Sequence, residues 1–280
     1  MNSKYEVLKL KSKKQENIED AISIEEPLEM LLKYKKNNEW IIENISITMR
    51  TPGNDEDLIT GFLFNEKIIE NFNQIEKIEK EGKGVGKYNL KNKIVIRINN
   101  SGNINIGKLR RNFLTNSSCG VCGKTSIDSL EVIKTDKIKK TVPKLSYETI
   151  IQAPELLRKS QSEFSKTGGI HASGLIDSSG KIIAVREDVG RHNALDKLIG
   201  HALKNNLLDS ENQFLTCSGR LSFELVQKAL MSNIAVLAGV GAPTSLAIDL
   251  AKRFDMTLLG FVKKDGFNIY SNKDRIIIKN

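Results

Sequence analysis

The feature of the sequence that most limits its fold is an alternation of short apolar runs with amphipathic stretches, which begins near Tyr147. The apolar runs predict strands over 213–217, 234–240 and 257–262, and the amphipathic stretches predict helices over 191–205, 222–231 and 244–254. Before them, the pattern predicts a helix over 147–166, interrupted near Pro154, and a hairpin of strands 170–177 and 181–186. This order is typical of a layered α/β sheet with parallel strands.

The first third of the chain has a different pattern, which predicts a smaller α+β unit. Residues 44–49 alternate polar and apolar side chains, as a half-buried strand does. A turn follows with Asn54 or Asp55 as a helix N-cap, so a short helix is expected over 58–64. Residues 88–99 alternate again and indicate a further strand pair. The expected division is an α+β domain over 1–108, a connecting segment over 109–142 and an α/β domain over 143–280.

Composition places the chain among folded proteins. Its 280 residues are 39% hydrophobic and 28% charged, unlike a disordered chain. No apolar stretch approaches the roughly 20 residues of a membrane span, and Lys and Glu are scattered where a signal peptide carries its apolar block. We therefore expect a cytoplasmic protein without a membrane partner. The net charge of +9 suits an anionic partner or a Lys-rich solvated surface, but with 6% aromatic residues we expect no nucleic acid partner.

Two cysteines two residues apart give the sharpest chemical signal, in the segment S-S-C-G-V-C-G-K over 117–124. A structural zinc site needs four ligands, and besides Cys119 and Cys122 the chain offers only Cys217 and three His. A thioredoxin-like redox pair would open a helix after a strand, whereas this pair lies in a Gly- and Ser-rich connection. Nearby Arg and Lys side chains favour a thiolate, which a nucleophile or sulfur carrier requires.

Two histidines occur in glycine-flanked turns. His171, in G-G-I-H-A-S-G-L, resembles the H-x-E of zinc nucleobase deaminases, but Ser173 stands where their Glu would be, which disfavours hydrolytic deamination. His192 follows Arg191 in V-R-E-D-V-G-R-H, where charged residues surround a strand-to-helix turn. The alternative for this second piece is an N-capped helix whose charges pair locally. His201, inside the amphipathic helix, is interpreted as structural.

Two strand ends run into glycine turns that open helices, C-S-G-R-L-S over 217–222 and G-V-G-A-P-T-S over 239–245. Backbone N–H groups at a helix start, with Arg220 beside them, can hold a phosphate. If the two strands are parallel neighbours, both turns lie on one carboxyl edge of the sheet, where such sheets bind ligands. Two such turns suit a dinucleotide, and neither matches a P-loop or the full G-x-G-x-x-G pattern. Simple tight turns are the alternative for each.

Taken in order, M-R-T-P-G-N-D-E-D-L, S-S-C-G-V-C-G, G-G-I-H-A-S-G, R-E-D-V-G-R-H-N-A-L-D-K, S-G-R-L-S-F-E-L and A-G-V-G-A-P-T-S resemble the formate dehydrogenase accessory sulfurtransferase family (FdhD). The resemblance begins near Glu26. It implies a carrier that takes persulfide sulfur from a cysteine desulfurase and transfers it to the molybdenum bis(molybdopterin guanine dinucleotide) cofactor, as formate dehydrogenase activity requires. It also implies a C-terminal domain similar in fold to cytidine deaminases.

The resemblance assigns roles to residues of this chain. Cys119 would carry the persulfide, and Cys122 would assist by releasing or protecting it. The cofactor is expected to bind at the glycine and histidine turns and at a C-terminal segment carried over from the family. These residues are His171, Arg191, His192, Ser218, Gly219, Arg220, Gly239, Gly241, Ala242, Pro243, Thr244, Phe261, Val262, Lys263, Lys264, Asp265 and Gly266. No residue is assigned to a metal site.

The implied partners are a cysteine desulfurase, formate dehydrogenase and a second copy of the chain in a homodimer. GDP is expected to mimic the cofactor, which binds as a substrate. The alternative function is a chaperone that binds a guanine nucleotide or the cofactor, has a zinc- or thiol-stabilised loop, and transfers no sulfur.

Overall fold

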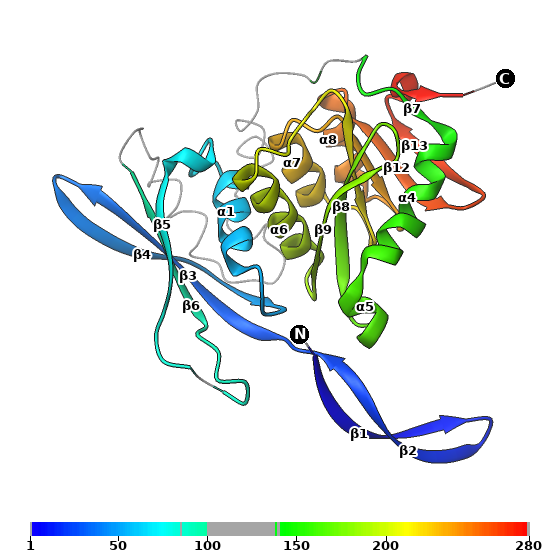
Figure 1. Ribbon diagram of the computed structural model, residues 1–280. Helices are drawn as coiled ribbons and strands as arrows, with labels where there is room; N and C mark the ends of the chain where they lie inside the picture. The colour runs from blue at the N-terminus through cyan, green and yellow to red at the C-terminus, as the bar shows by residue number, and fades with distance from the viewer. Residues whose placement is uncertain (1, 85, 100–137, 139–140, 279–280) are drawn as a thin grey trace.

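The α/β alternation builds a six-stranded sheet (Figure 1). The computed structural model describes residues 2–84, 86–99, 138 and 141–278. The strands of this sheet are β8 (His171–Asp177), β9 (Ile182–Asp188), β10 (Gln213–Cys217), β11 (Val236–Gly239), β12 (Thr257–Lys263) and β13 (Gly266–Ser271), in the order β13-β12-β11-β10-β8-β9. The central β10, β11 and β12 are parallel, as expected. The outer β8, β9 and β13 are antiparallel to their neighbours, because the β8–β9 and β12–β13 turns are too short for a parallel crossover.

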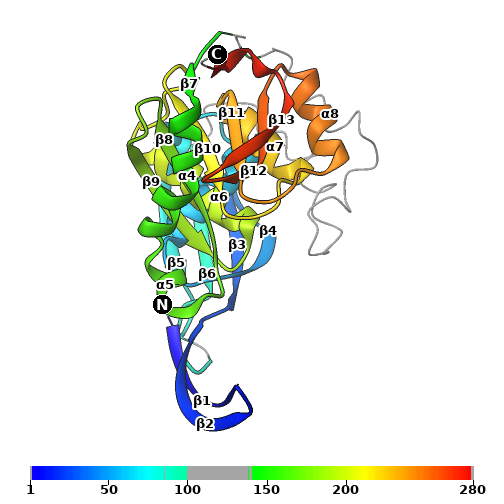
Figure 2. The same cartoon turned by 90° about the vertical axis from the view of Figure 1, so that its right-hand side faces the viewer.

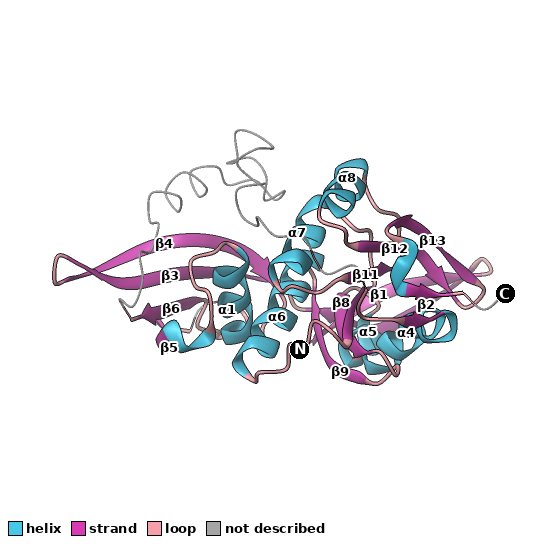
Figure 3. Ribbon diagram, turned by 90° about the horizontal axis from the view of Figure 1, so that it is seen from above, coloured by secondary structure: helices cyan, strands magenta, loops and turns pink. Residues whose placement is uncertain are grey.

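Helices cover both faces of this sheet. They are α4 (Tyr147–Ser160), α5 (Ser162–Thr167), α6 (Arg191–Lys204), α7 (Phe223–Met231) and α8 (Ser245–Arg253). α6, α7 and α8 lie side by side on one face, and α4 lies on the other (Figures 1 and 3). Apolar side chains from both helix layers and the strands form one continuous core. The sheet is therefore buried on both faces, which explains why its strands read as apolar runs.

The predicted interruption at Pro154 is wrong. α4 runs through Pro154, and the helix ends six residues later at Ser160, where Gln161 adopts an extended conformation. α5 then begins anew, and the Glu187 carboxylate accepts hydrogen bonds from the backbone N–H groups of Glu163 and Phe164 at 3.0 and 2.9 Å. The break is thus fixed by a tertiary contact of Glu187 with the first turn of α5.

A second, four-stranded sheet forms the N-terminal unit. Its strands are β3 (Glu26–Lys36), β4 (Glu39–Arg50), β5 (Ile75–Glu81) and β6 (Lys93–Ile98), in the order β4-β3-β6-β5, and α1 (Asp55–Asn65) packs on one face. A separate apolar cluster that includes Leu28, Leu32 and Leu58 fills the space between sheet and helix. The strand expected over 88–99 starts only at Lys93, because Asn89 adopts a left-handed conformation within a turn.

Several elements were not expected from the sequence. β1 (Asn2–Lys11) and β2 (Lys14–Ser23) form an antiparallel hairpin that extends away from both sheets (Figures 1 and 2). Its base is held where the Ser23 hydroxyl hydrogen-bonds that of Thr167 in α5, at 2.6 Å. Two short strands, β7 (Leu145–Ser146) and β14 (Ile276–Ile277), pair in parallel, and the 3₁₀ helices η1 and η2 span Phe72–Gln74 and Lys273–Arg275.

The two units meet where α1 packs against α6 (Figure 1). A Cβ atom on Gly61 would overlap the carbonyl oxygen of Asp196, and one on Gly200 would overlap that of Asp57. The missing side chains therefore let the two helix backbones come together. Buried polar contacts flank this crossing, because the Asn65 amide donates to the Asp196 carboxylate at 2.6 Å and Lys228 donates to the same group.

None of the helices in the described ranges combines the length and apolar character needed to cross a bilayer. The predicted domain boundaries at 108 and 142 stay predictions, since most of the connecting segment lies outside the described residues.

We expect Gly61→Ala to lower the free energy of unfolding by about 2 kcal/mol or more, because the added methyl group forces α1 away from α6. Urea unfolding measures this change. Gly169→Ala is the matched control, since its new Cβ would meet nothing nearer than 3.6 Å, and we expect its effect to stay within about 0.5 kcal/mol. Equal stabilities of the two variants would contradict the role given to Gly61.

Candidate functional site

Two glycine turns lie together at the carboxyl edge of the large sheet. β10 and β11 are parallel, and their last residues, Cys217 and Gly239, are register partners. The turns that follow are hydrogen-bonded to each other, with Gly241 N donating to Gly219 O at 3.1 Å and Leu221 N donating to Ala242 O at 3.0 Å. The sequence-based inference that both turns share one edge therefore holds.

The glycines serve contact between the turns more than they leave N–H groups unused. A Cβ on Gly239 would lie 2.6 Å from the Leu221 side chain, and one on Gly241 would lie 2.8 Å from the backbone of Arg220. Ser218 N donates to Ala172 O, and Thr244 N donates to Leu221 O, both at 3.0 Å. Several backbone donors that the sequence reasoning offered to a phosphate are thus already bonded within the protein.

His171 and Arg191 lie beside the first turn. A Cβ on Gly219 would lie 3.3 Å from His171 Nδ1 and 3.9 Å from the Arg191 side chain, so the open space over Gly219 is bounded by both. Burial lowers the pKa of His171 below its usual 6.5, and Arg191 and His192 lower it further, against the opposing effect of Asp188. The Arg191 Nε atom is buried and has no hydrogen-bond partner among the described residues. An unsatisfied cationic donor at the edge of the sheet suits an anionic ligand.

His192 is held from the start of the neighbouring helix. Its Nε2 atom lies 3.0 Å from the Ser222 hydroxyl and 3.4 Å from a carboxylate oxygen of Glu224, in the first turn of α7. Burial raises the pKa of Glu224, but hydrogen bonds from His192 and Ser222 outweigh burial, and the pKa falls to about 2. The sequence reasoning did not single out Ser222 or Glu224. A Glu in the first turn also stabilises a helix through its dipole, so the sequence offers no distinct signal.

The segment carried over from the family divides between two places. Phe261 adopts a left-handed conformation, is 42% exposed, and donates its backbone N–H to Gly241 O at 3.2 Å, so it borders the glycine turns. Val262 is buried in the core, where its side chain cannot meet a ligand. The turn that contains Lys264 and Asp265 lies against α4, because the Tyr147 hydroxyl donates to Asp265 O at 3.1 Å.

The structure thus gathers part of the expected site. The residues that lie at the carboxyl edge of β10–β12 or border it through the contacts above are His171, Arg191, His192, Ser218, Gly219, Arg220, Gly239, Gly241, Ala242, Pro243, Thr244 and Phe261. Lys263, Lys264, Asp265 and Gly266 belong to the end of the β12–β13 hairpin.

The three cysteines differ in what the structure says of them. Cys119 and Cys122 lie outside the described residues. Cys217 is buried, and burial raises the pKa of its thiol to about 11, while its sulfur lies 3.5 Å from the Ser173 hydroxyl. Cys217 therefore has little thiolate character at neutral pH. In the part of the chain that the structure describes, no three His, Cys, Asp or Glu residues gather as a metal site requires.

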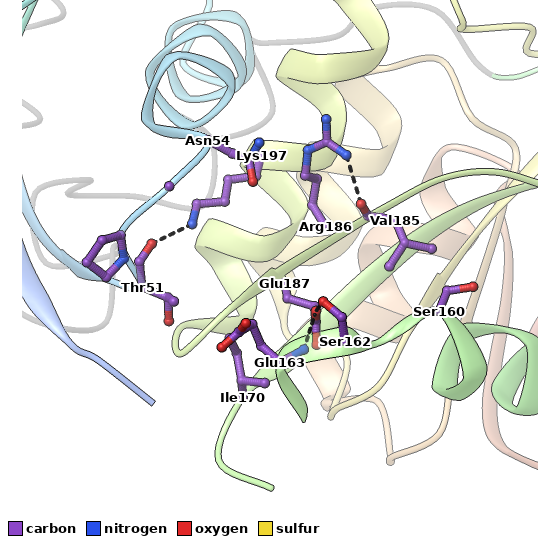
Figure 4. A pocket seen from close by; sticks show the side chains of 12 residues that line it. Thr51, Asn54, Ser160, Ser162, Glu163, Ile170, Val185, Arg186, Glu187 and Lys197 are labelled. Carbon is purple, nitrogen blue, oxygen red and sulfur yellow. Dashed lines mark hydrogen bonds between the residues drawn. The ribbon is translucent and has the colours of Figure 1, made fainter. Parts of the chain in front are cut away.

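A cavity of about 330 Å³, which the sequence did not indicate, lies between the turn over 51–54, the α4–α5 junction and β9 (Figure 4). Its charged side chains mostly bond within the protein. Lys197 donates to Thr51 O at 2.8 Å, Arg186 donates to Asp57 at 2.9 Å, and Glu187 binds the start of α5. These contacts tie the two units together, so the cavity reads as part of their junction.

Comparison with known proteins agrees with the fold and the motifs. Residues 24–277 match the model of the FdhD/NarQ family. A sulfur carrier protein FdhD from Picrophilus torridus is 43% identical over 260 residues, which cover 93% of each chain. One from Streptomyces coelicolor is 41% identical over 262 residues, 93% of this chain and 90% of that protein.

A solved structure, of a protein described as a formate dehydrogenase accessory protein from Desulfotalea psychrophila, has the same fold. It superposes with a TM-score of 0.72 at 22% identity and covers 99% of both chains. The family match over nearly the whole chain and the identity to its relatives show that the chain belongs to the FdhD/NarQ family.

Proposed function

We propose that the protein is a sulfur carrier that takes persulfide sulfur from a cysteine desulfurase and transfers it to the molybdenum bis(molybdopterin guanine dinucleotide) cofactor, for the maturation of formate dehydrogenase. The observation that carries the proposal is family membership together with the C-G-V-C motif. Relatives at 41 to 43% identity are named sulfur carrier proteins. The desulfurase, the cofactor and the dehydrogenase come from the resemblance of the motifs.

The carrier role falls on Cys119. The Cys119 thiolate attacks the outer sulfur of the desulfurase persulfide, a new S–S bond forms, the old one breaks, and the desulfurase cysteine leaves as a thiolate. Cys122 is close enough in sequence to release or protect the sulfur. The third cysteine, Cys217, is buried with a pKa near 11, which makes it a poor nucleophile.

The carboxyl edge of the large sheet is the proposed place for the cofactor, which binds there as a substrate. Its phosphates would meet Arg191, whose Nε lacks a partner, and Arg220, which is exposed on the first turn. Phe261 and the backbone of Gly219 would border the same ligand, as would the residue whose pKa burial and cations lower, His171. Guanidinium groups beside open backbone are the usual recognition elements for phosphate.

The second candidate is a chaperone that binds the nucleotide and transfers no sulfur, with Cys119 and Cys122 held by zinc or left as structural thiols. Metal analysis of protein purified without added zinc separates the two, because stoichiometric zinc on these thiolates would prevent Cys119 from accepting sulfur.

We expect Cys119→Ala to lose all persulfide loading, because no other thiol takes its place as nucleophile. Mass spectrometry after incubation with a cysteine desulfurase and cysteine should show an added mass of one sulfur in the wild type and none in the variant. Cys217→Ala is the matched control and should load normally, since the Cys217 thiol is buried. Loading of Cys119→Ala to the wild-type level would sink the assignment.

We expect GDP to bind with an affinity that falls as salt is raised, because its phosphates meet cations at the carboxyl edge. Arg220→Ala should weaken this binding by roughly ten-fold, as the loss of one charge-assisted contact does. Lys252→Ala is the matched control, since Lys252 is an exposed cation in the last turn of α8. Calorimetry measures all three proteins, and equal affinities for the two variants would argue against the turn as the phosphate site.

A homodimer is the expected assembly, since a cofactor with two guanine dinucleotide arms has approximate two-fold character and closed two-fold dimers are the commonest oligomers. Light scattering coupled to size exclusion should give twice the mass of 31.3 kDa. A single species at the monomer mass, with and without GDP, would refute the dimer.

A further inference from the structure

His192 is bound on only one of its two ring nitrogens. Nε2 lies 3.0 Å from the Ser222 hydroxyl and 3.4 Å from the Glu224 carboxylate, while Nδ1 has no hydrogen-bond partner among the described residues. His192 begins the first turn of α6, and Ser222 and Glu224 begin α7, so two helices with independent backbones fix the ring. The contact is therefore set by tertiary packing of α6 against α7.

The partners of Nε2 decide which nitrogen carries the proton in the neutral ring. The Glu224 carboxylate is ionised at neutral pH and accepts hydrogen bonds without donating any. Because the Ser222 hydroxyl donates to Glu224, its oxygen faces Nε2 with a lone pair. Both partners thus accept from Nε2, which assigns the hydrogen to Nε2 and leaves a lone pair on Nδ1.

Charged groups from every neighbouring element bear on this ring. α7 contributes Glu224, α6 contributes Arg191, β8 contributes His171, the end of β9 contributes Asp188, and the first glycine turn contributes Arg220. His171 and Arg191 flank the open side of Gly219. The Arg191 cation and the lowered pKa of His171 make this place one where a second positive charge forms only with compensation.

We propose that Glu224 is a positioning residue, which holds His192 through Nε2 so that the ring takes up one proton at Nδ1 when an anionic group of the ligand enters the site. The anion lies on one side of the resulting imidazolium and the Glu224 carboxylate on the other, and both favour the charged form. The proton comes from the solvent, and no bond other than N–H forms. This inference rests on the proposed function only for the identity of the ligand.

A purely structural role makes a different prediction. A Glu in the first turn of α7 stabilises that helix by charge–dipole interaction, and its removal would lower stability without changing proton uptake. The two roles are therefore separated by counting protons, and GDP is the probe.

Calorimetry of GDP binding to the full-length protein, in Tris and in HEPES at about pH 7.5, gives the number of protons bound with the ligand, because the two buffers release heat differently on losing a proton. We expect net uptake by the wild type and none by His192→Gln. Glu224→Gln keeps the shape of the side chain but not its charge, and should lose most of the uptake and bind GDP roughly ten-fold more weakly. Glu224→Asp, which restores the charge, should recover part of the uptake.

Uptake by Glu224→Gln equal to that of the wild type would overturn the proposal, and so would undiminished uptake by His192→Gln. A second measurement decides the case if GDP does not bind, an outcome that counts against the proposed cofactor site alone. Nitrogen chemical shifts of the histidine rings should show His192 as the Nε2–H form in the ligand-free wild type. Ser222→Ala combined with Glu224→Ala should give a mixture of both forms, and an unchanged pattern in this double variant would overturn the proposal.

Discussion

The buried ion pair between Asp188 and Lys197 fixes the relation between the two units and the start of α6. Asp188 ends β9, is fully buried, and accepts from Lys197 Nζ at 2.7 Å, from Thr51 N at 3.1 Å and from Gly190 N at 2.8 Å. Burial raises the pKa of Asp188, and only the contacts with Lys197 and with the backbone counter this effect. Loss of either charge would leave the other unpaired in the interior, at a cost of about 3–5 kcal/mol.

That network places the chemistry of the site. The turn after Asp188 leads directly into α6, whose first two residues are Arg191 and His192. The same helix packs through Gly200 on α1, so one element carries both the candidate site and the junction of the units. Fixed cations above an edge of parallel strands form a pre-organised anion site, in which the protein has met the cost of gathering the charges before the ligand arrives.

How far the sequence predicts this arrangement depends on the strength of local patterns. The apolar runs and helix stripes after Tyr147 placed nearly every element of the large sheet, because strands buried on both faces have few other readings. β1 and β2 were missed, since charges lie on both of their faces and leave no period of two. Glu224 was missed because its partner His192 lies on another helix. Gly61 and Gly200 could have been noticed as glycines inside helical patterns without a capping role. The roles of Cys119 and Cys122 rest on motif and family, as they lie outside the described residues.

The glycine crossing makes α6 a lever with its fulcrum at Gly200. His192 lies eight residues from that point, which is about 12 Å along the helix axis. A tilt of about 5° at the crossing would move the start of the helix by about 1 Å at this length, enough to break or form a hydrogen bond at the ring. Small changes in how the N-terminal unit sits on α6, whether from a partner protein or a second copy of the chain, would therefore be felt at the carboxyl edge of the sheet with their amplitude preserved.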